Sequence, residues 1–321
     1  MEHLLQTLKV VALAGGVGGA RLADGLAACL PPENLAVIVN VGDDFEHYGL
    51  SISPDLDTVC YTLAGLANPE SGWGRDAETW NVLDGLQALD GLTWFRMGDR
   101  DLATHLERTR RLRLGQPLSQ VTRQFCRAWG VSPLVLPASD DAVRTMVHTA
   151  EGELAFQDYF VHRQCQPRVV GFSFSGAGQA VAAPGVLSAL HAADLVIFCP
   201  SNPWVSLDPI LAVPGIKPAL DSKPVLAVSP IIGGKTVKGP AAKMFAELGI
   251  EPSSLAVASH YGDLLAGFVL DTVDASQAGA LTGMGIRPLV TDILMKSIPD
   301  RRRLAQEVLQ FGLELLTNAS Q

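Results

Sequence analysis

The sequence lacks several features that would place it in a broad class at once. Its five cysteines are odd in number, widely spaced and form no CxxC pair, which favours reduced thiols over a disulfide framework. No apolar run approaches the length of a membrane span, and the first residues carry neither a basic region nor a cleavage site. Basic residues number 24 against 33 acidic ones, so nucleic acid is not an expected partner. We therefore expect a cytoplasmic protein that acts away from membranes.

Common catalytic signatures are missing as well. There is no Walker loop and no HExxH, and GxGxxG is incomplete because Arg21 stands where the third glycine would be. GxSxG is also absent, since Phe174 replaces its first glycine. These gaps argue against a hydrolase nucleophile and against a standard dinucleotide fingerprint.

What the chain does have is glycine, 31 residues of 321, beside only 6% aromatic residues. This composition suits an α/β protein with many tight turns between parallel strands and helices. Short apolar runs followed by polar turns recur along the chain, which is typical of buried parallel strands. We expect a Rossmann-like, doubly wound and mainly parallel sheet with some antiparallel pairing. The expected strands are 8–14, 35–41, 133–136, 153–161, 168–173, 195–199, 225–229, 255–259, 268–270 and 288–291.

The chain is long enough for one large domain with a sizeable core. We expect a single domain over 1–321, with a core formed by 1–67 and 132–321 and a mainly helical insertion at 70–131. A short helix is expected to start at Ser139, and a docking helix at 301–316.

Charged residues of the insertion divide into two groups. The basic cluster formed by Arg108, Arg110, Arg111 and Arg113 is interpreted mainly as a solvated helix face. Arg96 and Arg100 differ, because they flank a Met-Gly-Asp turn, and they are candidates for ligand contact. His105 could touch the ligand too, although a lone histidine is more often structural.

The first expected strand leads directly into Gly15, Gly16, Val17, Gly18 and Gly19, and a helical pattern follows. In a strand–glycine–helix unit, backbone N–H groups and the helix N-terminus can hold a phosphate. Glycine allows an anion to approach the backbone closely. The alternative is merely a tight turn, which four glycines in five residues make less attractive.

An acidic stretch follows the second expected strand. Within residues 40–58 it offers six carboxylate or amide side chains, two of them in the run Pro-Asp-Leu-Asp. Carboxylates in such a set suit a hard cation such as Mg2+. The competing interpretation is a solvated loop in which Asp55 or Asp57 caps the helix of 59–66. The six residues are Asn40, Asp43, Asp44, Glu46, Asp55 and Asp57.

Two later turns add polar groups. Ser201 and Asn202 offer a hydroxyl and an amide that suit a base or a ribose. Lys235 and Lys238 follow a Gly-Gly turn and either meet phosphate or remain solvated. Together with the glycine loop and the acids, these turns suggest a nucleoside diphosphate chelated by Mg2+.

Seven blocks in order, within residues 9–270, resemble one family, the CofD/FbiA transferases of coenzyme F-420 biosynthesis. The blocks are GGVGGARLADGL, NVGDD, GLSISPDLDTVCYTLAG, MGDRDLATHL, LPASDD, CPSNPWVSLDPIL and SPIIGGKTVKGPAAKM. The resemblance implies a 2-phospho-L-lactate or phosphoenolpyruvate transferase. Its donor would be lactyl- or enolpyruvyl-diphospho-guanosine and its acceptor the ribityl hydroxyl of the deazaflavin Fo, with GMP and (dehydro) F-420-0 as products. The resemblance also implies Mg2+, and we expect a homodimer.

Carried over by position, the resemblance implies that Asp57 and Arg96 contact the deazaflavin. Asp55 or Asp57 would bind Mg2+, together with Asp44, and Asp57 could instead orient or deprotonate the hydroxyl. The four loop glycines would face phosphate, while Ser201 and Asn202 would face guanosine. Val17 stands where archaeal members typically have Thr, and Ala20-Arg21 replaces their Pro-Lys, so the chain looks like the bacterial branch. That favours the enolpyruvyl donor without deciding it.

Two alternative functions, a nucleotide-sugar-binding regulator and a Rossmann oxidoreductase, fit part of the pattern. YvcK-like proteins share the glycine loop and an acidic block, but they bind nucleotide sugars and act in regulation rather than catalysis. The PDLDT and GDRDLATH blocks argue against that alternative. A generic Rossmann oxidoreductase is disfavoured by the incomplete glycine fingerprint.

Overall fold

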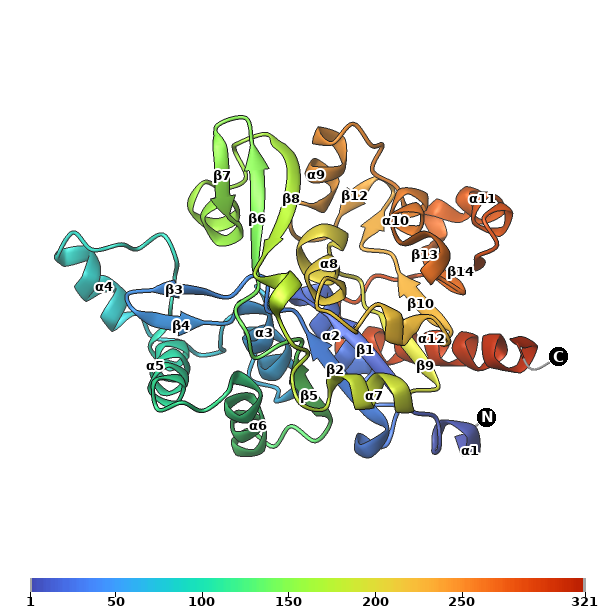
Figure 1. Ribbon diagram of the computed structural model, residues 1–321, viewed down its shortest axis with the longest axis horizontal. Helices are drawn as coiled ribbons and strands as arrows, with labels where there is room; N and C mark the ends of the chain where they lie inside the picture. The colour runs from blue at the N-terminus through green and yellow to red at the C-terminus, as the bar shows by residue number, and fades with distance from the viewer. Residues whose placement is uncertain (1, 320–321) are drawn as a thin grey trace.

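The computed structural model describes residues 2–319, and its centre is a seven-stranded sheet (Figure 1). The strand order is β14-β13-β10-β9-β1-β2-β5, and every neighbouring pair is parallel. The expected Rossmann-like, mainly parallel architecture is therefore confirmed. The strands are β1 (Val10–Ala14), β2 (Leu35–Val39), β5 (Leu134–Pro137), β9 (Leu195–Phe198), β10 (Val225–Val228), β13 (Gly267–Asp271) and β14 (Arg287–Thr291).

The central strands are apolar throughout because both of their faces are covered. Every residue of β1, β2, β9 and β10 is buried. Strands covered on both faces need continuous Val, Leu and Ile rather than an alternating pattern. In register, Val10 of β1 lies between Leu35 of β2 and Leu195 of β9, so β1 occupies the middle of the core.

The direction in which the chain adds strands reverses beside β1. From β1 the chain continues to β2 and β5 on one side, then returns and adds β9, β10, β13 and β14 on the other. The boundary between β1 and β9 is thus the topological switch point, where open α/β sheets bind ligands beyond their carboxyl ends. The glycine loop leaves β1 there, and Ser201 follows β9.

Helix α2 (Gly16–Ala27) packs against both α3 (Pro54–Leu63) and α12 (Ile298–Ala319). The approach of α12 is close, because a Cβ on Gly25 would collide with the carbonyl of Arg301. Arg301 also pairs with Asp24 at 3.0 Å. Figure 1 shows both termini at the same end of the molecule. The remaining helices outside the insertion are α1 (Glu2–Leu5), α7 (Val186–Ala192), α8 (Asp208–Leu211), α9 (Ala241–Glu247), α10 (Ser254–Tyr261) and α11 (Ala278–Gly283).

The segment between α3 and β5 carries three helices. They are α4 (Asn81–Ala88), α5 (Asp99–Arg113) and α6 (Leu118–Ala128). The acidic stretch itself contains an unexpected hairpin, β3 (Phe45–His47) and β4 (Leu50–Ile52). In Figure 1 this hairpin and α4 project from one side of the main sheet, at the opposite end from the termini. Helix α5 packs on β4, and α6 packs on β5.

Antiparallel strands form a smaller sheet in the order β7-β6-β8, which rises above the main sheet in Figure 1. Its strands are β6 (Arg144–Thr149), β7 (Gly152–Ala155) and β8 (Val169–Ser175). A further hairpin, β11 (Ile231–Ile232) and β12 (Lys235–Thr236), follows β10. The expected antiparallel pairing is confirmed. Within residues 2–319, no helix is long and apolar enough to cross a membrane.

Three expectations about individual elements were wrong. Ser139 starts no helix; it forms a single bridge with Ala182, and β6 follows. The run 255–259 lies in α10 rather than in a strand, and the Ser253 hydroxyl caps that helix by accepting from the N–H of Ala256 at 3.0 Å. The expected strand 153–161 stops at Ala155 and continues as a π-helical turn. Short apolar runs fit a strand and a buried helix equally well, so packing decides between them.

Candidate active site

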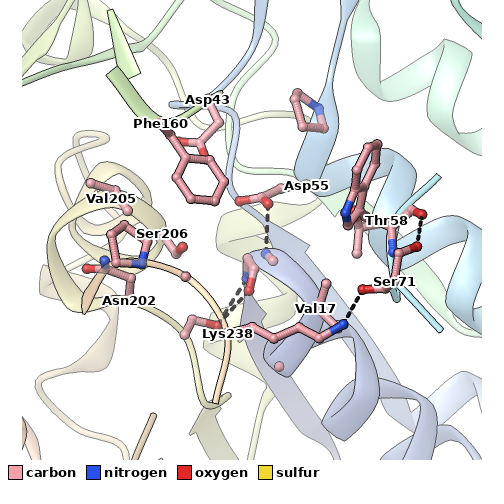
Figure 2. A pocket seen from close by; sticks show the side chains of 18 of the residues that line it. Val17, Asp43, Asp55, Thr58, Ser71, Phe160, Asn202, Val205, Ser206 and Lys238 are labelled. Carbon is pink, nitrogen blue, oxygen red and sulfur yellow. Dashed lines mark hydrogen bonds between the residues drawn. The ribbon is translucent and has the colours of Figure 1, made fainter. Parts of the chain in front are cut away.

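A cavity of about 730 Å³ lies beyond the carboxyl ends of β1, β9 and β10 (Figure 2). Its wall combines seven separate parts of the chain: the start of α2, the acidic stretch with α3, the insertion, the π-helical turn after β7, the turn after β9, the segment 229–241 with the hairpin β11–β12, and residues 293–295 after β14. A site at the switch point is therefore what the topology predicts and what the structure contains.

The glycine loop forms one end of this cavity. Gly15 precedes the first residue of α2, and its backbone is fixed by Ser201, whose hydroxyl donates to the Gly15 carbonyl at 2.9 Å. Gly15, Gly16 and Gly18 line the cavity, whereas Gly19 lies behind it and packs on Ala14. The first N–H groups of a helix have no partner within the helix, so this end can receive an anion.

Paired carboxylates lie directly beside the loop. Asp55 accepts from the backbone N–H of Gly16 at 2.7 Å and from the amide of Asn40 at 2.9 Å. The same Asn40 nitrogen also lies 3.2 Å from Asp43 Oδ1 and 3.0 Å from the carbonyl of Val205. One amide group with two hydrogens thus serves three acceptors, which leaves the two acids incompletely satisfied. Asp43 and Asp55 both line the cavity, and Figure 2 shows them above the loop.

Burial makes these carboxylates hard to ionise together. Burial raises the pKa of Asp55 to about 6, although Asn40 and the Gly16 amide partly offset the rise. Burial and the neighbouring Asp55 charge raise the pKa of Asp43 well above its usual value. Two buried acids in contact with one cavity fit a cation that would neutralise both.

Asp57 belongs to a second, separate network. Two guanidinium nitrogens of Arg108 contact its two oxygens, one of them at 3.0 Å, and both side chains are buried. Burial alone would lower the pKa of Arg108, but the Asp57 carboxylate raises it above its usual value. The interpretation of Arg108 as part of a solvated face was therefore wrong; Arg110 is solvated as expected.

His105 lies between two acids of this network. Its Nδ1 is 3.7 Å from Asp57, and its Nε2 is 3.2 Å from Asp101. The hydroxyl of Tyr61 donates to Asp101 at 2.8 Å. Although burial alone would raise the pKa of Asp101, the contact with His105 lowers it below its usual value. Asp57, Tyr61, Asp101 and His105 all line the cavity.

Ligand atoms of Asp57, Asp101 and His105 lie close enough together to hold a metal ion. Their electrostatics oppose it, however, because the guanidinium of Arg108 already contacts Asp57 and lies 3.2 Å from His105 Nδ1. A cation placed there would face a fixed positive charge. Of the two acidic groups, Asp43 with Asp55 suits a divalent cation better.

The other candidate residues lie in varied places. Arg96 lines the cavity, with its guanidinium 4.6 Å from the Trp80 ring, and Ser201 and Asn202 line it from the turn after β9.

Asp44 is buried behind the cavity, where it accepts from Ser53 at 2.8 Å, and burial raises its pKa to about 7. Arg100 is exposed and points to the carbonyl of Asp76. Asn40 lies beneath the two acids rather than in the wall.

Part of the cavity wall is aromatic, which the sequence analysis did not predict. Trp94 and Phe95 come from the insertion, and Phe156 and Phe160 come from the turn after β7. The rings of Phe156 and Phe160 are stacked with centroids 5.4 Å apart, and Trp94 stacks on His162 at 5.1 Å. Flat apolar side chains of this kind suit a planar ring system.

Two cations also lie in the wall, and the sequence analysis did not assign one of them, Arg21, to the site. Arg21 lies on α2, and Lys238 extends from the loop after β12 toward Ser71 in Figure 2. The sequence did suggest Lys238 as a possible phosphate contact, but gave Lys235 equal standing. Lys235 does not line the cavity.

Comparison with known proteins identifies the family of the chain. The model of the family "2-phospho-L-lactate transferase CofD" matches residues 10–283. The chain belongs to the CofD family. A phosphoenolpyruvate transferase of Streptomyces griseus is 43% identical, covering 96% of this chain and 99% of the relative. A 2-phospho-L-lactate transferase of Methanosarcina mazei is 38% identical, covering 94% of this chain and 99% of the relative.

Among solved structures, this CofD-family transferase resembles a UPF0052-family protein of Bacillus halodurans, with a TM-score of 0.64. The match covers 95% of this chain and 99% of the other, at 15% sequence identity. At that identity the likeness supports the α/β fold alone. The enzyme class of the CofD family rests instead on the family match and on the relatives.

Proposed function

We propose that this CofD-family enzyme transfers a phospholactyl or phosphoenolpyruvyl group from a guanosine diphosphate ester to the ribityl hydroxyl of Fo. The observation that carries the proposal is that one cavity is lined by two unlike groups of side chains. A helix N-terminus beside paired buried acids suits a metal-bound diphosphate. Four aromatic side chains suit a deazaflavin ring.

Mg2+ fits the residues at the acidic end. Asp43 and Asp55 would hold it, because both face the cavity and share one over-committed amide donor. Asp57 is already neutralised by Arg108, and Asp44 lies outside the wall, so both are weaker candidates. When bound, Mg2+ would neutralise charge on the phosphoryl oxygens of the donor.

The chain's own groups position the reactants. The first N–H groups of α2 would bind the diphosphate, and the aromatic wall would hold the deazaflavin with its ribityl chain toward Asp57. Asp57, fixed by Arg108, would accept a hydrogen bond from the attacking hydroxyl and then its proton. The hydroxyl oxygen forms a bond to the β-phosphorus while the bond from that phosphorus to the GMP oxygen breaks. Such transfers depend on positioning and charge stabilisation, so no nucleophilic side chain is needed.

The donor is proposed to carry the enolpyruvyl group. Actinobacterial relatives at 43% identity bear the name phosphoenolpyruvate transferase, while the archaeal relative at 38% bears the lactate name. The difference between 43% and 38% identity is small, so the preferred donor has to be determined by experiment. Fo, GMP release, the homodimer and a cytoplasmic location are likewise parts of this proposal.

Mass spectrometry of the product tests the reaction. Purified enzyme is incubated with Fo, Mg2+ and either donor, and the enolpyruvyl product is lighter than the lactyl product by two hydrogen atoms. We expect conversion with the enolpyruvyl donor at the higher kcat/KM. If the enzyme converts neither donor, and if UDP-sugars rather than GDP raise its melting temperature, the result would support the alternative of a nucleotide-sugar-binding regulatory protein.

A further inference from the structure

Arg21 and Lys238 are cations in the cavity wall that have no carboxylate partner among residues 2–319. Arg21 donates one bond, to the carbonyl of Met295 at 2.9 Å, and its other N–H groups are left for a ligand. The ammonium of Lys238 donates to the carbonyl oxygens of Glu70 and Ser71. Both residues line the same cavity as the glycine loop.

The two positive charges lie near enough to affect each other. Burial and the charge of Arg21 lower the pKa of Lys238, and burial and Arg301 lower the pKa of Arg21. Like charges placed together in a partly buried wall repel each other unless an anion lies between them. Their juxtaposition therefore indicates an anionic ligand group.

The backbone holds Lys238 in this place. The carbonyls of Glu70 and Ser71 fix its ammonium, and the neighbouring Gly72 packs so closely on Val17 that a Cβ would lie 2.5 Å from a Val17 methyl. The loop after β12 and the loop before α4 thus meet over the start of α2. The lysine reaches the cavity from a supported position, unlike a freely solvated side chain.

Arg21 lies five residues along α2 from Gly16, which corresponds to about 7.5 Å of helix rise. Both side chains therefore add charged donors to the cavity that the helix N-terminus also faces, so that the cavity can bind a second anionic group. The proposed donor carries one further anionic group beside its diphosphate, the carboxylate of its lactyl or enolpyruvyl part.

We propose that Arg21 and Lys238 bind the carboxylate of the transferred group and so select donors that carry one. This inference rests on the proposed function. A guanidinium can bind a carboxylate through two parallel hydrogen bonds, while an ammonium contributes a point charge. A donor lacking the carboxylate would leave both charges unpaired, which disfavours its binding.

The test compares ligands with and without a carboxylate. Arg21→Gln, Arg21→Lys and Lys238→Gln are made beside Lys235→Gln, a control that removes the same charge from a residue outside the wall. Calorimetry measures binding of phosphoenolpyruvate and of GDP, and steady-state kinetics measures the donor and acceptor KM. We expect the Gln variants to raise the Kd for phosphoenolpyruvate and the donor KM about tenfold, as one lost charged contact does. The same variants should keep the Kd for GDP and the acceptor KM within about twofold of the unaltered enzyme. Lys235→Gln should keep all four quantities within about twofold. Arg21→Lys should raise the Kd for phosphoenolpyruvate and the donor KM less than Arg21→Gln does.

Two results would overturn the inference: unchanged phosphoenolpyruvate binding in the Gln variants, or an equal loss of GDP binding, which would assign the pair to a phosphate. The proposed reaction is judged separately, from turnover by the unaltered enzyme. If neither donor is turned over while phosphoenolpyruvate binding still depends on Arg21 and Lys238, the carboxylate subsite stands and the proposed reaction falls.

Discussion

Arg108 and Asp57 form a buried ion pair that joins α5 of the insertion to α3 of the core, with both side-chain oxygens of the acid contacted by the guanidinium. The pair sets the direction of Asp57 toward the cavity. It also makes the insertion part of the candidate active site, because the same guanidinium contacts His105 at 3.2 Å.

Arg108→Met should destabilise the protein strongly. Removing one partner of a buried pair leaves an uncompensated charge, which typically costs about 3–5 kcal/mol. Urea unfolding measures the loss, and Arg110→Met, on the exposed face of the same helix, should leave the midpoint unchanged. The double variant Arg108→Met with Asp57→Asn should recover part of the stability. Equal effects of the two arginine substitutions would contradict the burial of the pair.

Asp57→Ala should abolish transfer to Fo, because the attacking hydroxyl loses the group that orients it. Asp57→Asn keeps the volume and one acceptor, so it should retain a small residual rate, although both variants leave Arg108 without its counter-ion and should unfold at a lower urea concentration. Product formation is followed by mass spectrometry, and the fold by circular dichroism. A wild-type rate in Asp57→Ala would show that the hydroxyl is positioned by another group.

The choice of metal ligands can be checked without turnover. Asp43→Asn and Asp55→Asn should each abolish Mn2+ binding observed by electron paramagnetic resonance, since each removes one of the two carboxylates proposed to hold the metal. Asp44→Asn should retain binding within a few-fold, because that side chain lies behind the wall and contacts Ser53. Loss of Mn2+ in Asp44→Asn with retention in Asp43→Asn would reverse the assignment.

Phe160→Ala should weaken acceptor binding selectively. The ring is 36% exposed and stacks on Phe156, so its loss affects stability little. A stacking contact contributes about 1 kcal/mol, which corresponds to roughly a fivefold rise in the KM for Fo. Phe160→Leu keeps an apolar side chain without the flat face and should not restore the KM. If the donor KM rises instead, the aromatic wall holds guanine rather than deazaflavin.

Gly18→Ala should damage the loop by steric collision. A Cβ at Gly18 would strike the carbonyl oxygen of Pro200, which belongs to the turn after β9. Overpacking of this kind costs about 1–3 kcal/mol and would also displace Ser201 from the cavity. Gly178→Ala is the matched control, because a Cβ there meets no atom within 4 Å. A melting temperature equal to that of the control would show that the turn can yield.

Features that depend on residues close together in the chain could be predicted from the sequence. Continuous Val, Leu and Ile runs gave the central strands, since a strand covered on both faces needs them at every position. The glycine turn at Gly15 and Gly16 was likewise readable, because a strand, a turn and a helix follow one another within a few residues. The acids of the stretch 40–58 were identified as a group, but their roles were not separated.

Only the tertiary structure divided those acids and completed the site. Asp57 pairs with Arg108, which lies 51 residues further along the chain, while Asp43 and Asp55 both contact the amide of Asn40. Phe160 reaches the cavity from a distant turn that no local pattern marks, and only the packing shows that Lys238, and not Lys235, lines the cavity. The reason is physical: apolar periodicity is set by each element's own burial, whereas the partner of a charge is set by how separate elements pack.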